Sequence, residues 1–192
     1  SASVPVHWRD FRRATLTKSK GIWNRETSSR PMCDWVLFDL GSESLLEPIG
    51  QDADRFRVTK YDPDQMREAH SPGRHRYLIA REVVEADVII NLPKLKTHRK
   101  TCVTGSLKNL VGVNGNKDYL PHHRLGGRQA GGDCYAGGSR LKLAAELLSD
   151  AANRREGISA YLLWQAVRGS YGLARVAGAD RNLEGIWYGN DT

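Results

Sequence analysis

A short run of β-branched residues between a helical pattern and a proline constrains the fold of this chain most. Residues 87–93 read DVIINLP, which is typical of a buried strand that a proline ends. Before this run, Ile79, Val83 and Ala86 recur at helical spacing. The order of helix, buried strand and loop predicts an α/β fold, in which a largely parallel sheet is flanked by helices.

Three further segments fit this class. Residues 35–40 form a second apolar run, closed by a glycine, and predict another strand. Residues 141–155 carry an apolar stripe at helical spacing and predict an amphipathic helix, on whose solvent-exposed surface we expect Lys142. A second helix is predicted over 158–176, broken or bent near residues 169–172.

The length of 192 residues is that of one domain. Residues 1–30 are basic and without clear periodicity, and we expect them to form an irregular arm. Residues 31–192 then form a single α/β domain. Because the chain does not begin with Met and residues 183–188 look like the start of another element, we expect an incomplete fragment of a larger domain, truncated at its C-terminus.

The net charge of +7 is unevenly distributed. Residues 94–128 hold eight Lys or Arg against one acidic residue, whereas residues 31–93 hold seven against twelve. A nucleic-acid surface usually interleaves such charge with aromatic rings, and the only aromatic residue between 94 and 128 is Tyr119. We therefore expect a local site for an anion and no nucleic-acid partner.

The three cysteines, Cys33, Cys102 and Cys134, lie far apart in the sequence. An odd number excludes a closed disulfide framework and favours a reducing, cytoplasmic compartment. The spacing also predicts no iron–sulfur cluster within this chain, since such a cluster usually needs four thiolates. We expect Cys102 to be a packed, buried side chain. No apolar run approaches the roughly 18 residues of a membrane span, so we expect no membrane partner.

The loop after residues 87–93 carries the candidate site, because ligands bind beyond the carboxyl ends of strands in open α/β sheets. Two lysines and a histidine stand at alternate positions, so an extended chain places them on one face. A turn at a glycine then begins a helix whose free N–H groups could bind an anion. We predict that His98 and Lys108 are catalytic and face one cavity. The predicted ligand-binding residues are Lys94, Lys96, Thr104, Gly105, Ser106, Asn109 and Lys117. The alternative is a solvated basic loop without a ligand.

The following residues, 112–138, are rich in glycine and lack periodicity, and we expect a loop that orders over ligand. Two histidines here precede Asp133 and Cys134. Adjacent histidines on an extended chain point apart, and the spacing matches no metal-binding motif, so we assign no metal ligand. Whether a metal binds near His122, His123 and Asp133 stays open.

Residues 86–98, ADVIINLPKLKTH, and residues 103–112, VTGSLKNLVG, resemble the domain of unknown function family three-six-two. Its members are often fused to ferredoxin-type iron–sulfur modules. The resemblance covers about residues 80–125 and implies an α/β fold, a prokaryotic cytoplasmic setting and an unassigned activity. The order of strand, histidine loop and lysine is also similar to the lactate racemase family. That similarity implies a nickel-containing pincer cofactor handled by His98 and Lys108, although Ser106-Leu107 replaces the family's double glycine.

Two functions remain. The first is an enzyme domain that binds a carboxylate or phosphate of a small molecule, as an isomerase or an oxidoreductase-associated domain. The second is a non-catalytic accessory or electron-transfer partner whose basic face docks an acidic protein, such as a ferredoxin-like module. The sequence leaves open which of them applies, and what the substrate and the oligomeric state are.

Overall fold

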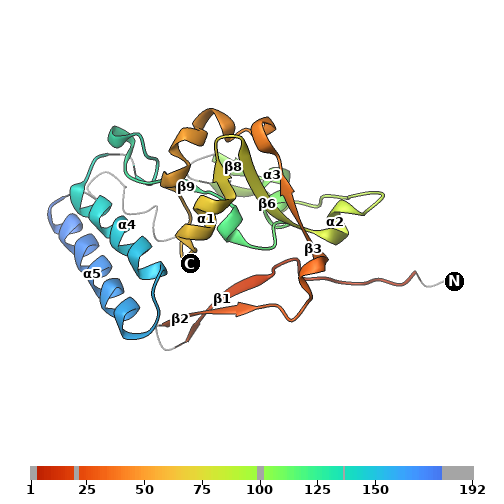
Figure 1. The fold of residues 1–192 in the computed structure, drawn as a ribbon, viewed down its shortest axis with the longest axis horizontal. Coiled ribbons are helices and arrows are strands. Elements are labelled where there is room, and N and C mark those ends of the chain that lie inside the picture. Colours follow the sequence, from red (N-terminus) through yellow and green to blue (C-terminus); the bar gives the residue numbers. More distant parts are fainter. Residues whose placement is uncertain (1–3, 20–21, 99–101, 136, 179–192) are drawn as a thin grey trace. The chain divides into compact units, whose positions relative to one another are not determined.

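The computed structural model describes residues 4–19, 22–98, 102–135 and 137–178 (Figure 1). The chain divides into two units. The first unit runs up to Phe38 and includes Tyr77–Asn116, and the second comprises Asp39–Arg76 and the residues from Lys117 on. The predicted division into an arm and a domain at residue 30 stays a prediction.

The first unit begins with a hairpin. Strands β1 (Ala14–Ser19) and β2 (Ile22–Thr27) pair in antiparallel fashion, from Ala14 opposite Thr27 to Ser19 opposite Ile22. The expectation of an irregular arm over residues 1–30 is therefore wrong for this part. Both segments are rich in β-branched residues, and only two residues separate them, the connection that favours a hairpin over a disordered tail.

The remaining elements of the first unit follow the predicted order only in part. They are η1 (Met32–Asp34), β3 (Trp35–Asp39), β6 (Arg74–Ala80), α2 (Arg81–Val84), β7 (Lys96–His98), β8 (Cys102–Thr104) and α3 (Ser106–Val111). The predicted strand over residues 35–40 and the helix from Ser106 are confirmed. The strand over residues 87–93 is not formed, and Val88, Ile90 and Leu92 are exposed. A β-branched run becomes a buried strand only where partner strands pair with it on the sheet.

Trp35 is a buried residue of the first unit and contacts several distant segments of the chain. Its indole N–H donates to the carbonyl of Phe11 at 2.9 Å, and the Arg30 guanidinium lies 4.9 Å from the ring centroid. Gly115 donates its N–H to the carbonyl of Leu78 at 2.6 Å. It lies so close to Trp35 that a Cβ at this position would overlap the indole nitrogen. The segment after α3 is thereby fixed beside β6.

The second unit contains short elements followed by two long helices. They are η2 (Gly41–Glu43), η3 (Glu47–Arg55), β4 (Phe56–Arg57), α1 (Pro63–Ala69), β5 (His70–Ser71), η4 (Lys117–Tyr119), β9 (His123–Arg124), η5 (Arg128–Ala130), α4 (Arg140–Asn153) and α5 (Gly157–Val176). Its hydrophobic core consists of Ala53, Phe56, Val58, Tyr61 and Met66.

Helices α4 and α5 pack against each other, as Figure 1 shows at the blue end of the chain. The side chain of Ser139 caps α4 by accepting the N–H of Lys142 at 3.3 Å. Both helices were predicted from apolar periodicity, and both are confirmed. The predicted break near residues 169–172 does not occur, because α5 runs without interruption to Val176.

The α/β class is confirmed, but a largely parallel sheet is not what the described strands form. Strands β3, β6 and β5 form one sheet in the order β3-β6-β5, and the other pairs are β1-β2, β4-β9 and β7-β8. The pairs β1-β2, β4-β9, β5-β6 and β7-β8 are antiparallel. Short connections explain the pairs β1-β2, β5-β6 and β7-β8, because a few residues can join only antiparallel neighbours, whereas a parallel pair needs a long crossover.

Candidate functional site

The predicted basic site lies on the β7–β8 hairpin of the first unit. Lys96 pairs with Thr104 and His98 with Cys102 across the two strands. The Thr104 hydroxyl donates to the carbonyl of Lys96 over a long 3.5 Å. His98 ends β7, and its side chain lies outside the described part of the chain. The prediction that His98 and Lys108 face one cavity therefore stays a prediction.

An asparagine pair connects the loop before β7 to α3. The Asn91 amide donates to the carbonyl of Ser106 at 2.9 Å, and the Asn109 amide donates to the Asn91 side-chain oxygen at 2.9 Å. These two contacts hold the loop, the hairpin and the helix as one local structure, which we call the lysine hairpin (residues 91–111). Six predicted site residues belong to it and are described with side chains: Lys94, Lys96, Thr104, Ser106, Lys108 and Asn109.

Helix α3 is short and offers less positive charge at its N-terminus than the sequence suggested. It has six residues, and its N-cap Gly105 has a backbone outside the extended and helical regions, with φ −154° and ψ −128°, and offers no side-chain cap. The dipole of so short a helix is small, because it is the sum of few aligned peptide units. Positive charge in the lysine hairpin therefore comes from its lysines.

The electrostatics of this segment are one-sided. No Asp or Glu stands between Asp87 and Asp118, and Lys94, Lys96 and Lys108 are all exposed. An ammonium group 4 Å from an anion is worth about 1 kcal/mol in bulk water and about 4 kcal/mol at an effective dielectric constant of about 20. Since these lysines face solvent, the smaller value applies to each of them.

Two residues differ from the sequence prediction, one in its position and one in its burial. Lys117 belongs to the second unit, where its ammonium group donates to the carbonyl of Thr59. Cys102 was expected to be buried, but it is exposed and has a left-handed backbone with φ 60°. Cys102 begins β8, opposite His98 of β7.

A cavity of about 290 Å³ lies elsewhere in the first unit. Arginines and carboxylates line it in equal number, and they pair with one another: Arg30 with Asp34 at 2.7 Å, and Arg81 with Glu85 at 3.1 Å. Because its charges are compensated, this cavity has little attraction for an anion. None of the predicted site residues lines it.

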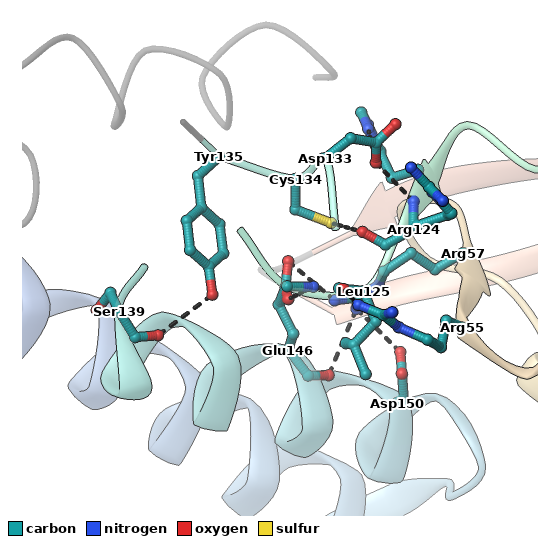
Figure 2. A network of polar contacts seen from close by, with 12 residues as sticks. Arg55, Arg57, Arg124, Leu125, Asp133, Cys134, Tyr135, Ser139, Glu146 and Asp150 are labelled. Atoms are coloured by element: carbon teal, nitrogen blue, oxygen red, sulfur yellow. Dashed lines mark hydrogen bonds and ion pairs between the residues drawn. The ribbon is translucent and has the colours of Figure 1, made fainter. Parts of the chain in front are cut away.

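Sequence reasoning missed a buried ion network in the second unit, which Figure 2 shows. The Arg57 guanidinium donates to Asp150 at 2.9 Å and lies 3.1 Å from Glu146, whose side chain is fully buried. The Tyr61 hydroxyl donates to Asp150 at 3.1 Å, and the N–H of Gly126 donates to Glu146 at 2.8 Å. The network connects α4 to three other parts of the unit: β4, the loop before α1 and the loop after β9.

The protonation of this network follows from burial and pairing. Burial raises the pKa of the Asp150 carboxyl group, although Arg57 opposes this shift. Burial disfavours the charged form of Arg57, but Asp150 and Glu146 outweigh it and raise the pKa of the guanidinium. Burial also raises the pKa of the Tyr61 hydroxyl. Arg57 is therefore held in its charged form and Tyr61 in its neutral form, as is typical of a structural network.

Lys142 was expected on the exposed surface of α4, but it is 1 % exposed. Its ammonium group lies 5.3 Å from the centroid of the Tyr135 ring. Lys142, Glu146 and Asp150 follow one another at intervals of four residues and so share one face of α4. This charged row is visible in the sequence, but the apolar stripe alone led us to place Lys142 in solvent.

Two buried histidines form a second polar group in this unit. The Nδ1 atoms of His70 and His75 lie 3.2 Å apart. The Nε2 atom of His70 is 3.1 Å from the carbonyl oxygen of Tyr119, and the Nε2 atom of His75 is 3.1 Å from the Glu47 carboxylate. Burial lowers the pKa of His70 to about 4.

No helix among the described residues is long and apolar enough to cross a membrane. Comparison with known proteins gives two matches. The family described as "Domain of unknown function (DUF362)" matches residues 13–191. "Thylakoid-associated protein sll1697" of Synechocystis sp. (strain ATCC 27184 / PCC 6803 / Kazusa) is 30% identical over 117 residues, which are 61% of this chain and 33% of that protein. The chain thus spans about a third of the length of this relative. No solved structure matches the present chain. The resemblance to the lactate racemase family stays a prediction.

Proposed function

This chain belongs to the DUF362 family of domains of unknown function, and we propose that it is an enzyme domain that binds an anionic small molecule at the lysine hairpin. The ligand carries a carboxylate or a phosphate. Lys94, Lys96 and Lys108 neutralise this group, and His98 acts as the acid or base. The reaction class proposed with it is an isomerisation or a step coupled to oxidoreduction, in a prokaryotic cytoplasm.

One observation carries this proposal. The asparagine pair Asn91–Asn109 joins the loop that bears Lys94 to the helix that bears Lys108, in a segment without any acidic residue. Three exposed ammonium groups contribute together about 3 kcal/mol to the binding of an anion. This amount corresponds to a dissociation constant in the millimolar range, so a simple anion binds weakly and the rest of a substrate must add affinity.

The first experiment titrates inorganic phosphate, a nucleotide and a small dicarboxylate into the protein and follows binding by NMR. Removing one lysine in Lys96→Ala or Lys108→Ala is expected to weaken binding about fivefold, since each ammonium contributes about 1 kcal/mol. Arg168→Ala removes one exposed positive charge from α5 and is the matched control. Equal affinities of all three variants would leave the lysine hairpin as a solvated basic loop.

The second experiment addresses the chemistry. Mass spectrometry of small molecules that co-purify with the protein identifies the ligand. With that compound as substrate, His98→Gln is expected to keep the dissociation constant and to lower turnover about 10²–10⁴-fold, the usual effect of removing a general acid or base. Unchanged turnover would remove His98 from the mechanism.

A second candidate function is docking of an acidic protein, such as a ferredoxin-like module. It is supported by the exposed side chains of Leu92 and Leu95, which lie beside the lysines and suit a protein surface better than a small anion. Binding to a purified acidic ferredoxin, measured at low and high salt, distinguishes this candidate, because such docking weakens steeply as salt rises.

A further inference from the structure

His123, Asp133 and Cys134 lie together in the second unit, although the sequence suggested no ligand spacing. Each residue offers one ligand atom, and these atoms all lie within 4.8 Å of one another. The imidazole Nδ1 of His123 is 3.8 Å from the carboxylate of Asp133. One histidine of the pair is therefore placed beside the acid and the thiol, and the adjacent His122 is not part of the group.

Backbone contacts hold the two ends of the intervening loop together. The N–H of Arg124 donates to the Asp133 carboxylate at 2.6 Å, and the N–H of Asp133 donates to the carbonyl of Arg124 at 3.1 Å. The N–H of Cys134 donates to the carbonyl of Gly126 at 3.1 Å. Figure 2 shows Cys134 and Asp133 beside Arg124. The Cys134 thiol donates to the carbonyl of Arg124 at 3.2 Å. The three ligand positions are thus fixed by the fold of the loop.

The donor set selects the type of ion. A thiolate, an imidazole and a carboxylate are ligands that Zn²⁺ accepts in tetrahedral sites, whereas Mg²⁺ and Ca²⁺ take oxygen ligands. Cys134 is buried and Asp133 is exposed, so the group has a protein side and a solvent side. Three protein ligands leave the fourth position of a tetrahedral ion to water on the solvent side.

We propose that His123, Asp133 and Cys134 bind one zinc ion. On binding, the Cys134 S–H bond breaks, its proton passes to solvent and a zinc–sulfur bond forms. The thiolate and the carboxylate together carry two negative charges, which the ion neutralises. Binding also links His123 to Asp133 and Cys134 through the metal, and so stabilises the second unit, because the ion binds the folded chain more tightly than the unfolded one.

The test uses the whole chain, produced without a histidine tag and treated with a chelator. Co²⁺ is the probe, because tetrahedral Co²⁺ has intense visible bands and a thiolate ligand adds a charge-transfer band in the near ultraviolet. We expect one equivalent of Co²⁺ to give both bands and Zn²⁺ to abolish them by displacement. Cys134→Ser is expected to lose the charge-transfer band. Asp133→Asn and His123→Ala are expected to weaken Zn²⁺ binding at least about 10- to 100-fold. Loss of a residue that only hydrogen-bonds to a metal ligand already has an effect of this size.

Two control variants match these changes. Cys102→Ser removes an exposed thiol, and His122→Ala removes the neighbouring exposed imidazole, so both should keep the spectrum and the affinity. Because Cys134 is buried, its variant could fail to fold. The exposed Asp133→Asn variant then decides, with circular dichroism confirming its fold. The proposal is overturned if the wild-type protein gives no thiolate charge-transfer band, or if Zn²⁺ affinity is the same in Asp133→Asn and His123→Ala as in the controls.

Discussion

The environment of the His70–His75 pair determines the charge of His70. The two Nδ1 atoms lie 3.2 Å apart, the Nε2 atom of His70 lies 3.1 Å from the carbonyl oxygen of Tyr119, and the Nε2 atom of His75 lies 3.1 Å from the Glu47 carboxylate. Burial lowers the pKa of His70 to about 4, so this ring is neutral at neutral pH.

The neutral state of His70 predicts a pH dependence of stability. Its pKa is about 4 in the folded protein and near 6.5 in the unfolded chain, so between these values the unfolded chain binds more protons. The free energy of unfolding should fall as pH drops from about 6.5 to about 4, by roughly 3 kcal/mol in total. Urea unfolding across this range should show a smaller fall for His70→Gln than for the wild type. The exposed-site variant His122→Gln should follow the wild type, and equal slopes for all three proteins would contradict the prediction.

The contact between Gly115 and Trp35 predicts a position-specific effect of one methyl group. Gly115→Ala places a Cβ on the indole and should lower the free energy of unfolding by about 1–3 kcal/mol, as overpacking does. Gly169→Ala adds the same atom on α5, where nothing lies within 4 Å. It should raise stability by about 0.5–1 kcal/mol, because glycine is a poor helix former. Thermal unfolding of both variants measures the contrast, and a shift of the same sign in both would refute it.

At the scale of elements, the ion network determines how α4 is attached. Glu146→Gln leaves the Arg57 guanidinium buried with only part of its compensating charge. The loss of one partner of a buried ion pair typically costs about 3–5 kcal/mol. The exposed Glu68→Gln on α1 should change stability by less than about 0.5 kcal/mol. Chemical denaturation at neutral pH compares the two, and a small effect of Glu146→Gln would show that the network is dispensable.

Local periodicity predicted some elements and failed for others. The stripe over 141–155 produced α4, because an amphipathic helix needs only residues within a few turns of one another. The run over 87–93 has equally strong β propensity, but a strand also needs hydrogen-bonding partners that its own sequence does not specify. Lys142 was misplaced because residues outside the helix surround it, and Tyr135 is one of them.

At the scale of the whole molecule, the two candidate sites differ in how far local sequence patterns predict them. The lysine hairpin was predicted as a group because its residues lie within 21 positions of one another, from 91 to 111, and a hairpin and a short helix bring them together. The zinc ligands are near in sequence, but their grouping depends on a glycine-rich loop whose path has no periodic signal. The Arg57–Glu146 pair joins positions 89 apart, which sequence patterns of single elements cannot reveal.

The exposed run over 87–93 makes this chain vulnerable to self-association, and its flanks restrain that tendency. Short apolar segments of high β propensity and low charge template intermolecular sheets, and a proline or a charge at their end acts as a gatekeeper. Pro93 and Lys94 occupy that position after Val88, Ile90 and Leu92. Pro93→Val should therefore increase light scattering during incubation at equal concentration, whereas Pro48→Val, at an exposed proline outside this run, should not. Equal scattering would mean that the run needs no gatekeeper.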